Sequence, residues 1–77
     1  MATIVTDWPR EARRVLKMEL AAKDMSFKEL SRALETVVNV KEEPKALSNK
    51  INRGTFSFIF FLQCMKALGV ETIKLRD

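Results

Sequence analysis

The sequence predicts a small all-α domain, and three observations favour this fold class. Only two glycines and two prolines occur among 77 residues, which leaves little material for long loops. Apolar residues make up 47% of the chain, which suits a packed core better than a disordered tail. Apolar side chains also recur three and four residues apart in successive segments. We therefore expect residues 1–77 to form one compact domain of four to five helices.

The first helix should span residues 9–23. Asp7 can cap it, and Pro9 suits its first turn. Apolar residues then follow at helical spacing, namely Ala12, Val15, Leu16 and Leu20. The other face of this helix is basic, with Arg10, Arg13, Arg14 and Lys17.

The second helix should span residues 27–37. Ser26 and Glu29 have the spacing of a capping box at its start. One apolar stripe follows, formed by Phe27, Leu30, Leu34 and either Val37 or Val38. The β-branched run TVVNV weakens the end of this helix, and Asn39 could close it.

The third helix should span residues 43–53. Pro44 fits its first turn, and Leu47 and Ile51, four residues apart, should face the core. Gly54 follows Arg53 and can adopt the left-handed conformation that ends many helices without a Cβ penalty.

The fourth helix should span residues 57–68 and end at Gly69. Its sequence FIFFLQCMKAL is apolar on nearly every side, which predicts the most buried helix of the domain. Phe61 and the single cysteine, Cys64, are therefore expected in the core. The segments ATIVT and ETIKLRD at the two ends are β-branched, and either could form a short strand, so the two could pair.

The composition excludes several kinds of site. There is no histidine and only one cysteine, so a catalytic triad with histidine, a Cys/His zinc site and an internal disulfide are ruled out. The remaining polar residues form no catalytic constellation, and we expect no enzyme activity, metal, cofactor or small-molecule ligand. The N-terminus does not resemble a signal peptide, and no apolar run approaches the ~20 residues of a membrane span. A cytoplasmic protein that does not enter the membrane is expected.

The charge distribution points to an acidic partner. The net charge is +4, and no acidic residue lies between Pro44 and Val70. With Leu47 and Ile51 facing inward, the outer face of the third helix should present Lys45, Ser48, Asn49 and Asn52, with Lys50 and Arg53 beside it. Such side chains make the usual contacts to DNA bases and phosphates. A solvated polar face is the alternative interpretation.

The order of these segments resembles a known class. A basic first helix is followed by MSFKELSRAL, then LSNKINRG, then an apolar helix ending in KALGV. Over residues 10–70 this is similar to the lambda-repressor-like (Xre-type) helix-turn-helix domains of bacteria and phage. The longer string from WPREARRVLKMEL to CMKALGV is also similar to a small bacterial family of unassigned function within that class.

The resemblance implies a DNA-binding protein, such as a small transcriptional regulator, that binds double-stranded DNA. The third helix would enter the major groove, with Lys45, Ser48 and Asn49 near bases and Lys50, Asn52 and Arg53 on phosphates. A homodimer would present two such helices about 34 Å apart, one turn of DNA.

The sequence departs from the pattern of that class at three places. Phe27 replaces a glutamine beside the cap of the second helix, and Asp24 replaces a glycine before that cap. The connection between the second and third helices is longer than the usual ~3–4 residues and contains Glu42 and Glu43. These acids would repel phosphate unless they point away. The alternative function is a protein-interaction module that keeps the fold without binding DNA. Its contact surface would be the phenylalanines around TFSF or an unpaired terminal strand.

Overall fold

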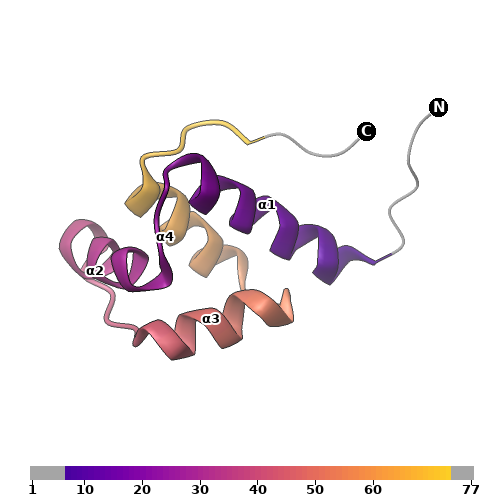
Figure 1. Ribbon diagram of the computed structural model, residues 1–77, viewed down its shortest axis with the longest axis horizontal. Coiled ribbons are helices and arrows are strands. Elements are labelled where there is room, and N and C mark those ends of the chain that lie inside the picture. Colours follow the sequence, from indigo (N-terminus) through magenta and orange to yellow (C-terminus); the bar gives the residue numbers. More distant parts are fainter. Residues whose placement is uncertain (1–6, 74–77) are drawn as a thin grey trace.

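The computed structural model describes residues 7–73, and these residues form four helices (Figure 1). The helices are α1 (Trp8–Ala22), α2 (Phe27–Val38), α3 (Pro44–Arg53) and α4 (Phe58–Leu68). Residues 7–73 contain no strand, so the expected all-α class is confirmed, and no fifth helix occurs in this part of the chain. Two terminal segments were expected to be able to form strands. ATIVT lies outside the described residues. Of ETIKLRD, residues 71–73 have no regular structure, and the rest lies outside the described residues. No helix within residues 7–73 is long and apolar enough to cross a membrane.

Side-chain caps fix the starts of α1, α2 and α4. The Asp7 carboxylate accepts a hydrogen bond from the Arg10 amide at 3.1 Å, and Ser57 Oγ accepts one from the Phe60 amide at 3.0 Å. At α2 the expected capping box is present. Ser26 Oγ accepts from the Glu29 amide at 3.2 Å, and Glu29 Oε1 accepts from the Ser26 amide at 3.0 Å. The Ser26 hydroxyl also donates to Glu29 Oε1, at 3.1 Å, and the two hydrogen bonds that this carboxylate accepts, from the Ser26 amide and hydroxyl, lower its pKa.

Replacement of Ser26 should test this capping box. Ser26→Ala removes the acceptor for the Glu29 amide and should lower the free energy of unfolding by about 1 kcal/mol near neutral pH. Because the pKa of Glu29 is lowered in the folded state, its share of the stability is present above its ordinary pKa and is lost as the pH falls through its folded pKa. Urea unfolding should therefore show a larger difference between parent and variant near pH 7 than near pH 3. Thr55→Ala, at an exposed position outside the helices, is the control.

Four residues with positive φ shape the connections. Gly54 ends α3 with φ 70°, the left-handed cap that the sequence predicts, and Asn39, expected to close α2, does so with φ 56°. Gly69 ends α4 with φ 72°. Asp24, between α1 and α2, also has positive φ, at 53°. Asp24 therefore adopts a backbone conformation that glycine favours. The lambda-repressor-like domains, which this sequence resembles, have glycine at this position.

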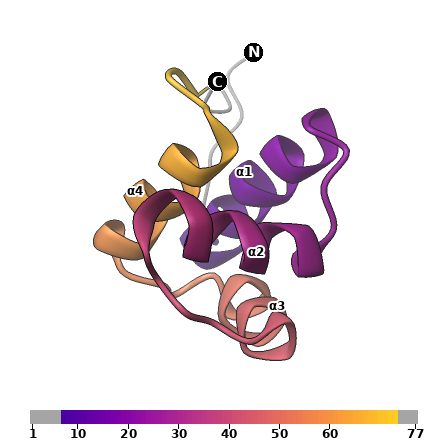
Figure 2. The same cartoon turned by 90° about the vertical axis from the view of Figure 1, so that its left-hand side faces the viewer.

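The core draws side chains from all four helices. It contains Leu16, Leu20, Leu30, Leu34, Leu47, Ile51, Phe60, Cys64, Met65 and Leu68. Helix α2 lies against both α3 and α4 (Figure 2), and α1 also packs on α3 and α4. Val38, rather than Val37, packs against this core, and Val37 is 51% exposed.

Helix α4 has the largest share of buried residues among the four helices, as predicted, but it is not buried all round. Phe60, Cys64, Met65 and Leu68 are buried, but Phe58, Ile59 and Leu62 are 70%, 69% and 50% exposed. Phe61 is only partly buried. The reason is that α4 packs mainly on α2 and less extensively on α1, so its remaining side meets no other helix within residues 7–73. The apolar character of that side needs another explanation.

Candidate nucleic-acid interface

Helix α3 lies at one edge of the molecule, and its outer face is open to solvent (Figures 1 and 2). Leu47 and Ile51 are completely buried, which fixes the rotation of the helix about its axis. The side chains of Lys45, Asn49, Asn52 and Arg53 are therefore exposed. Ser48 is half-buried, and its Oγ accepts a hydrogen bond from Asn52 Nδ2 at 3.2 Å. Five of the six residues expected to contact DNA thus lie on or beside the open face of α3.

Lys50 is in a different situation. Its Nζ lies 2.6 Å from Glu42 Oε1 and 4.7 Å from the centroid of the Phe60 ring. Glu42 is itself anchored, because Ser31 Oγ donates a hydrogen bond to its backbone carbonyl at 2.5 Å. The ion pair therefore ties the connection between α2 and α3 to α3 and, through Phe60, to α4. Glu42 points towards Lys50, and its charge is compensated within the domain.

Arg13 contacts the far end of α3, a role that the sequence did not reveal. Its Nη1 donates a hydrogen bond to the Asn52 carbonyl at 3.1 Å, across 39 positions of the chain. A cation at the carboxyl end of a helix satisfies an unpaired carbonyl and complements the helix dipole. Arg13 therefore orients α3 relative to α1.

A small hollow of about 230 Å³ lies beside α3, where α4 begins. Its lining includes Lys50, Arg53, Thr55 and Ser57. Helix α4 begins next to this hollow, at Phe58, and the start of a helix favours negative charge. Thr55 and Ser57 were not among the expected DNA contacts. The serine that precedes the apolar run FIFF, a typical N-cap, was the feature that could have identified them.

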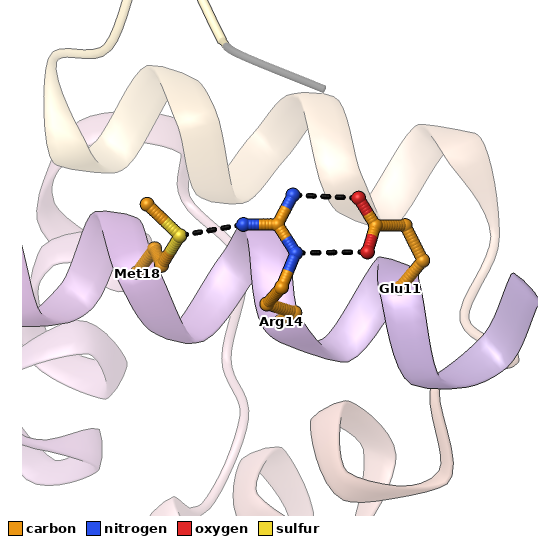
Figure 3. Close-up of polar contacts among 3 residues, drawn as sticks. All are labelled: Glu11, Arg14 and Met18. Atoms are coloured by element: carbon orange, nitrogen blue, oxygen red, sulfur yellow. Dashed lines mark hydrogen bonds and ion pairs between the residues drawn. The ribbon is translucent and has the colours of Figure 1, made fainter. Parts of the chain in front are cut away.

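One of the four cations expected on the basic face of α1, Arg14, forms an ion pair within the helix. Arg14 makes two hydrogen bonds to the Glu11 carboxylate, of 2.8 and 2.6 Å, and its Nη1 lies 2.7 Å from the Met18 sulfur (Figure 3). The hydrogen bond to Glu11 raises the pKa of the Arg14 guanidinium. Figure 3 shows the three side chains following one another along α1. The charge of Arg14 is thus balanced by Glu11 and contributes little to a basic surface.

Cys64 is completely buried in the core, as expected for a structural thiol. Burial raises the pKa of this thiol to about 12, and neighbouring Lys50 and Glu42 have smaller, opposing effects. The thiol is therefore protonated at neutral pH. Within residues 7–73, no group of three or more cysteine, aspartate or glutamate side chains is arranged to hold a metal ion.

Cys64 supplies a test of this packing at alkaline pH. A thiol-specific reagent at about pH 8 should react with the folded protein far more slowly than with the urea-unfolded protein. Because the folded-state pKa is raised from 9.0 to about 12, the stability that this thiol contributes is complete below pH 9.0 and is lost as the pH rises towards 12. In Cys64→Ala, the unfolding free energy measured in urea should therefore fall less between pH 9 and pH 12 than in the parent. Equal reaction rates for the folded and unfolded protein would show that Cys64 is accessible.

One comparison with known proteins places the chain in a family. The family model described as "Domain of unknown function (DUF6471)" matches residues 8–73, which include all four helices, and the chain belongs to this family. Searches among curated proteins and among solved structures found no match.

Proposed function

We propose that this DUF6471 domain binds double-stranded DNA through the exposed face of α3, as a small transcriptional regulator of the helix-turn-helix type. The observation behind the proposal is the open face formed by Lys45, Asn49, Asn52 and Arg53. It lies within a stretch, residues 44–70, that contains no acidic residue. Helices α2 and α3 would form the helix-turn-helix unit, with residues 39–43 as its connection.

The amides of α3 favour base contacts. Asparagine can bind adenine through two hydrogen bonds, and serine can donate to or accept from several bases. Asn49 is exposed in the middle of α3. The hydrogen bond from Asn52 Nδ2 to Ser48 Oγ holds two further polar side chains in a fixed arrangement one turn apart. Lys45, in the first turn of α3, would contact guanine or a nearby phosphate.

The region around the start of α4 favours phosphate contacts. Arg53 is exposed and lines the hollow that also contains Thr55 and Ser57. A guanidinium group, hydroxyl groups and the amino end of a helix are all groups that bind phosphate oxygens. We assign the main phosphate contact to Arg53.

Of the two acids in the connection, Glu42 is compatible with DNA binding in this arrangement, whereas Glu43 is exposed at the N-cap of α3 and makes no side-chain capping hydrogen bond. Glu42 is paired with Lys50, so it presents little uncompensated charge to a phosphate. The same pair reduces what Lys50 can contribute, because a cation already paired releases fewer counterions when it meets DNA. Lys50 therefore acts chiefly by positioning α3, rather than as the phosphate contact first expected.

A salt titration with short random-sequence duplexes tests the proposal. The dissociation constant of the parent should rise steeply with salt. Arg53→Ala should weaken binding to all sequences and reduce the salt slope by roughly one, and Lys50→Ala should reduce it by less. Glu42→Gln should steepen the slope, because it frees the charge of Lys50. Lys66→Ala, in the last turn of α4, is the matched control and should leave the slope unchanged.

Base contacts need a separate measurement. On a preferred site selected from random DNA, Asn49→Ala should cost about 1–3 kcal/mol of binding free energy, with little change on other sequences. Absence of any affinity of the parent for duplex DNA at low salt, where cationic binding is strongest, would contradict the proposal. The domain would then be better described as a protein-interaction module with the same fold.

A further inference from the structure

A groove of about 420 Å³ lies between α1 and α4, away from the outer face of α3. It adjoins the hollow at the start of α4, because Phe56 lines both. Trp8, Ala12 and Val15 line it from α1, and Phe58 and Phe61 line it from α4, with Ile73 beyond the end of α4. The ring of Phe61 stacks on those of Phe56 and Phe58, with centroids 6.4 and 6.3 Å apart. The aromatic wall of the groove is therefore preorganised.

Apolar side chains also stand exposed next to the groove. Phe58 and Trp8 lie at its edge and are 70% and 65% exposed, and Ile59 and Leu62 are exposed on the same helix as Phe58. A monomeric protein seldom leaves so many large apolar side chains together in water. The surface contains both a hollow and protruding side chains, as an isologous contact between two copies of one chain requires.

The polar groups of the groove argue against a small-molecule ligand. Such sites combine apolar walls with polar groups that converge on the ligand. Among the described residues that line this groove, Glu11 is the one with an ionisable side chain. Its carboxylate already accepts hydrogen bonds from two Arg14 nitrogens, Nη2 at 2.6 Å and Nε at 2.8 Å. The groove therefore favours an apolar partner surface over a polar ligand.

Charge favours a second copy in particular. The chain has a net charge of +4, so two copies repel each other unless they meet on a side with little net charge. At the groove, the one ionisable lining residue, Glu11, is compensated by Arg14, so this side of the described residues has little net charge. The α3 face, by contrast, has exposed cations and no acid of its own.

We propose that two copies of this chain form a two-fold dimer through the α1–α4 groove, with exposed side chains of α4 from each copy filling the groove of the other. The residues that line the groove are separate from Lys45, Asn49, Asn52 and Arg53 on α3. The outer face of α3 therefore remains free in such a dimer, whereas the hollow with Thr55 and Ser57 adjoins the interface at Phe56. Dimerisation is measured without DNA, so it is tested separately from DNA binding.

Sedimentation and tryptophan fluorescence test this proposal on the full chain. Trp8 is the single tryptophan and lies in the groove, so its emission reports on that surface directly. From about 1 μM to about 1 mM, the parent should change from monomer to dimer, with a parallel blue shift of Trp8 emission. Phe58→Lys should raise the dimer dissociation constant at least about tenfold. Val37→Lys, at a similarly exposed apolar position on α2, should leave it unchanged.

Each other outcome would overturn the proposal. A monomer at every concentration with solvent-exposed Trp8 would leave the groove open to a different partner. A monomer with blue-shifted Trp8 emission would mean that the chain's own terminal residues cover the groove. A dimer that survives Phe58→Lys, or that Val37→Lys disrupts, would place the interface elsewhere. Thermal melts of both variants at low concentration verify that each folds.

Discussion

Gly54→Ala should destabilise the domain by about 2–5 kcal/mol, although it adds a single methyl group. A Cβ atom at this position would lie 2.0 Å from the Pro9 carbonyl oxygen and 2.6 Å from its carbon. Both are backbone atoms, so a side-chain rotation cannot relieve the overlap. The start of α1 would have to move away from the end of α3. Alanine must in addition adopt φ 70°, which costs roughly 1–2 kcal/mol.

Gly69→Ala is the matched control for this effect. Gly69 has nearly the same φ, 72°, but no atom lies within 4 Å of the position that a Cβ would occupy. This variant should lose only the conformational part, roughly 1–2 kcal/mol. The difference between the unfolding free energies of the two variants, measured in urea, is the cost of the overlap with Pro9 alone, because the cost of the positive φ is common to both. Equal losses for Gly54→Ala and Gly69→Ala would show that the contact between Gly54 and Pro9 is absent.

Phe60→Ala should have the second large effect, about 3–5 kcal/mol of unfolding free energy. Phe60 lies in the core and is only 5% exposed, and the ammonium group of Lys50 lies over its ring. Since the whole stability of a small domain is about 5–15 kcal/mol, this variant should be partly unfolded at ordinary temperature. A thermal melt or circular dichroism spectrum measures the loss.

Two neighbouring phenylalanines provide the comparison for Phe60. Phe58→Ala, at an exposed position, should change the stability by no more than about 0.5 kcal/mol at concentrations that keep the protein monomeric. Phe61→Ala should fall between the two, because Phe61 is only partly buried. A larger loss of stability for Phe58→Ala than for Phe60→Ala would show that Phe58, and not Phe60, faces the core.

The helix boundaries could be predicted because their determinants are local. The Asp7, Ser26 and Ser57 caps and the left-handed residues Asn39 and Gly54 lie within a few positions of the ends that they define. Each helix accordingly begins and ends within one residue of its expected position. The inward faces of α1 and α3 followed from the spacing of their apolar residues.

The exposure of α4 could not be predicted in the same way. Every side of its sequence is apolar, so periodicity cannot identify the side that meets α2. Whether a helix is covered all round depends on how many others surround it. In residues 7–73 there are only three others, and α4 packs mainly on one of them.

The charged contacts also depend on the tertiary path of the chain. Lys50 meets Glu42, which lies eight positions earlier in the connection of residues 39–43, and Arg13 meets the Asn52 carbonyl from a different helix. Neither pair has the three- or four-residue spacing that reveals a contact within one helix. The sequence thus indicated which residue types face outward on α3. It did not distinguish the exposed Arg53 from the paired Lys50.

The binding of DNA by α3 is tested most directly by amide NMR of the full chain during titration with a short DNA duplex at low salt. We predict shift changes at the exposed residues of α3, centred on Asn49 and Arg53, and at Thr55 and Ser57, with all of them reversed by added salt. Groove residues away from that hollow, such as Trp8, Ala12 and Ile73, should shift little at constant protein concentration. Shifts confined to that groove, or none at all, would contradict the proposed function.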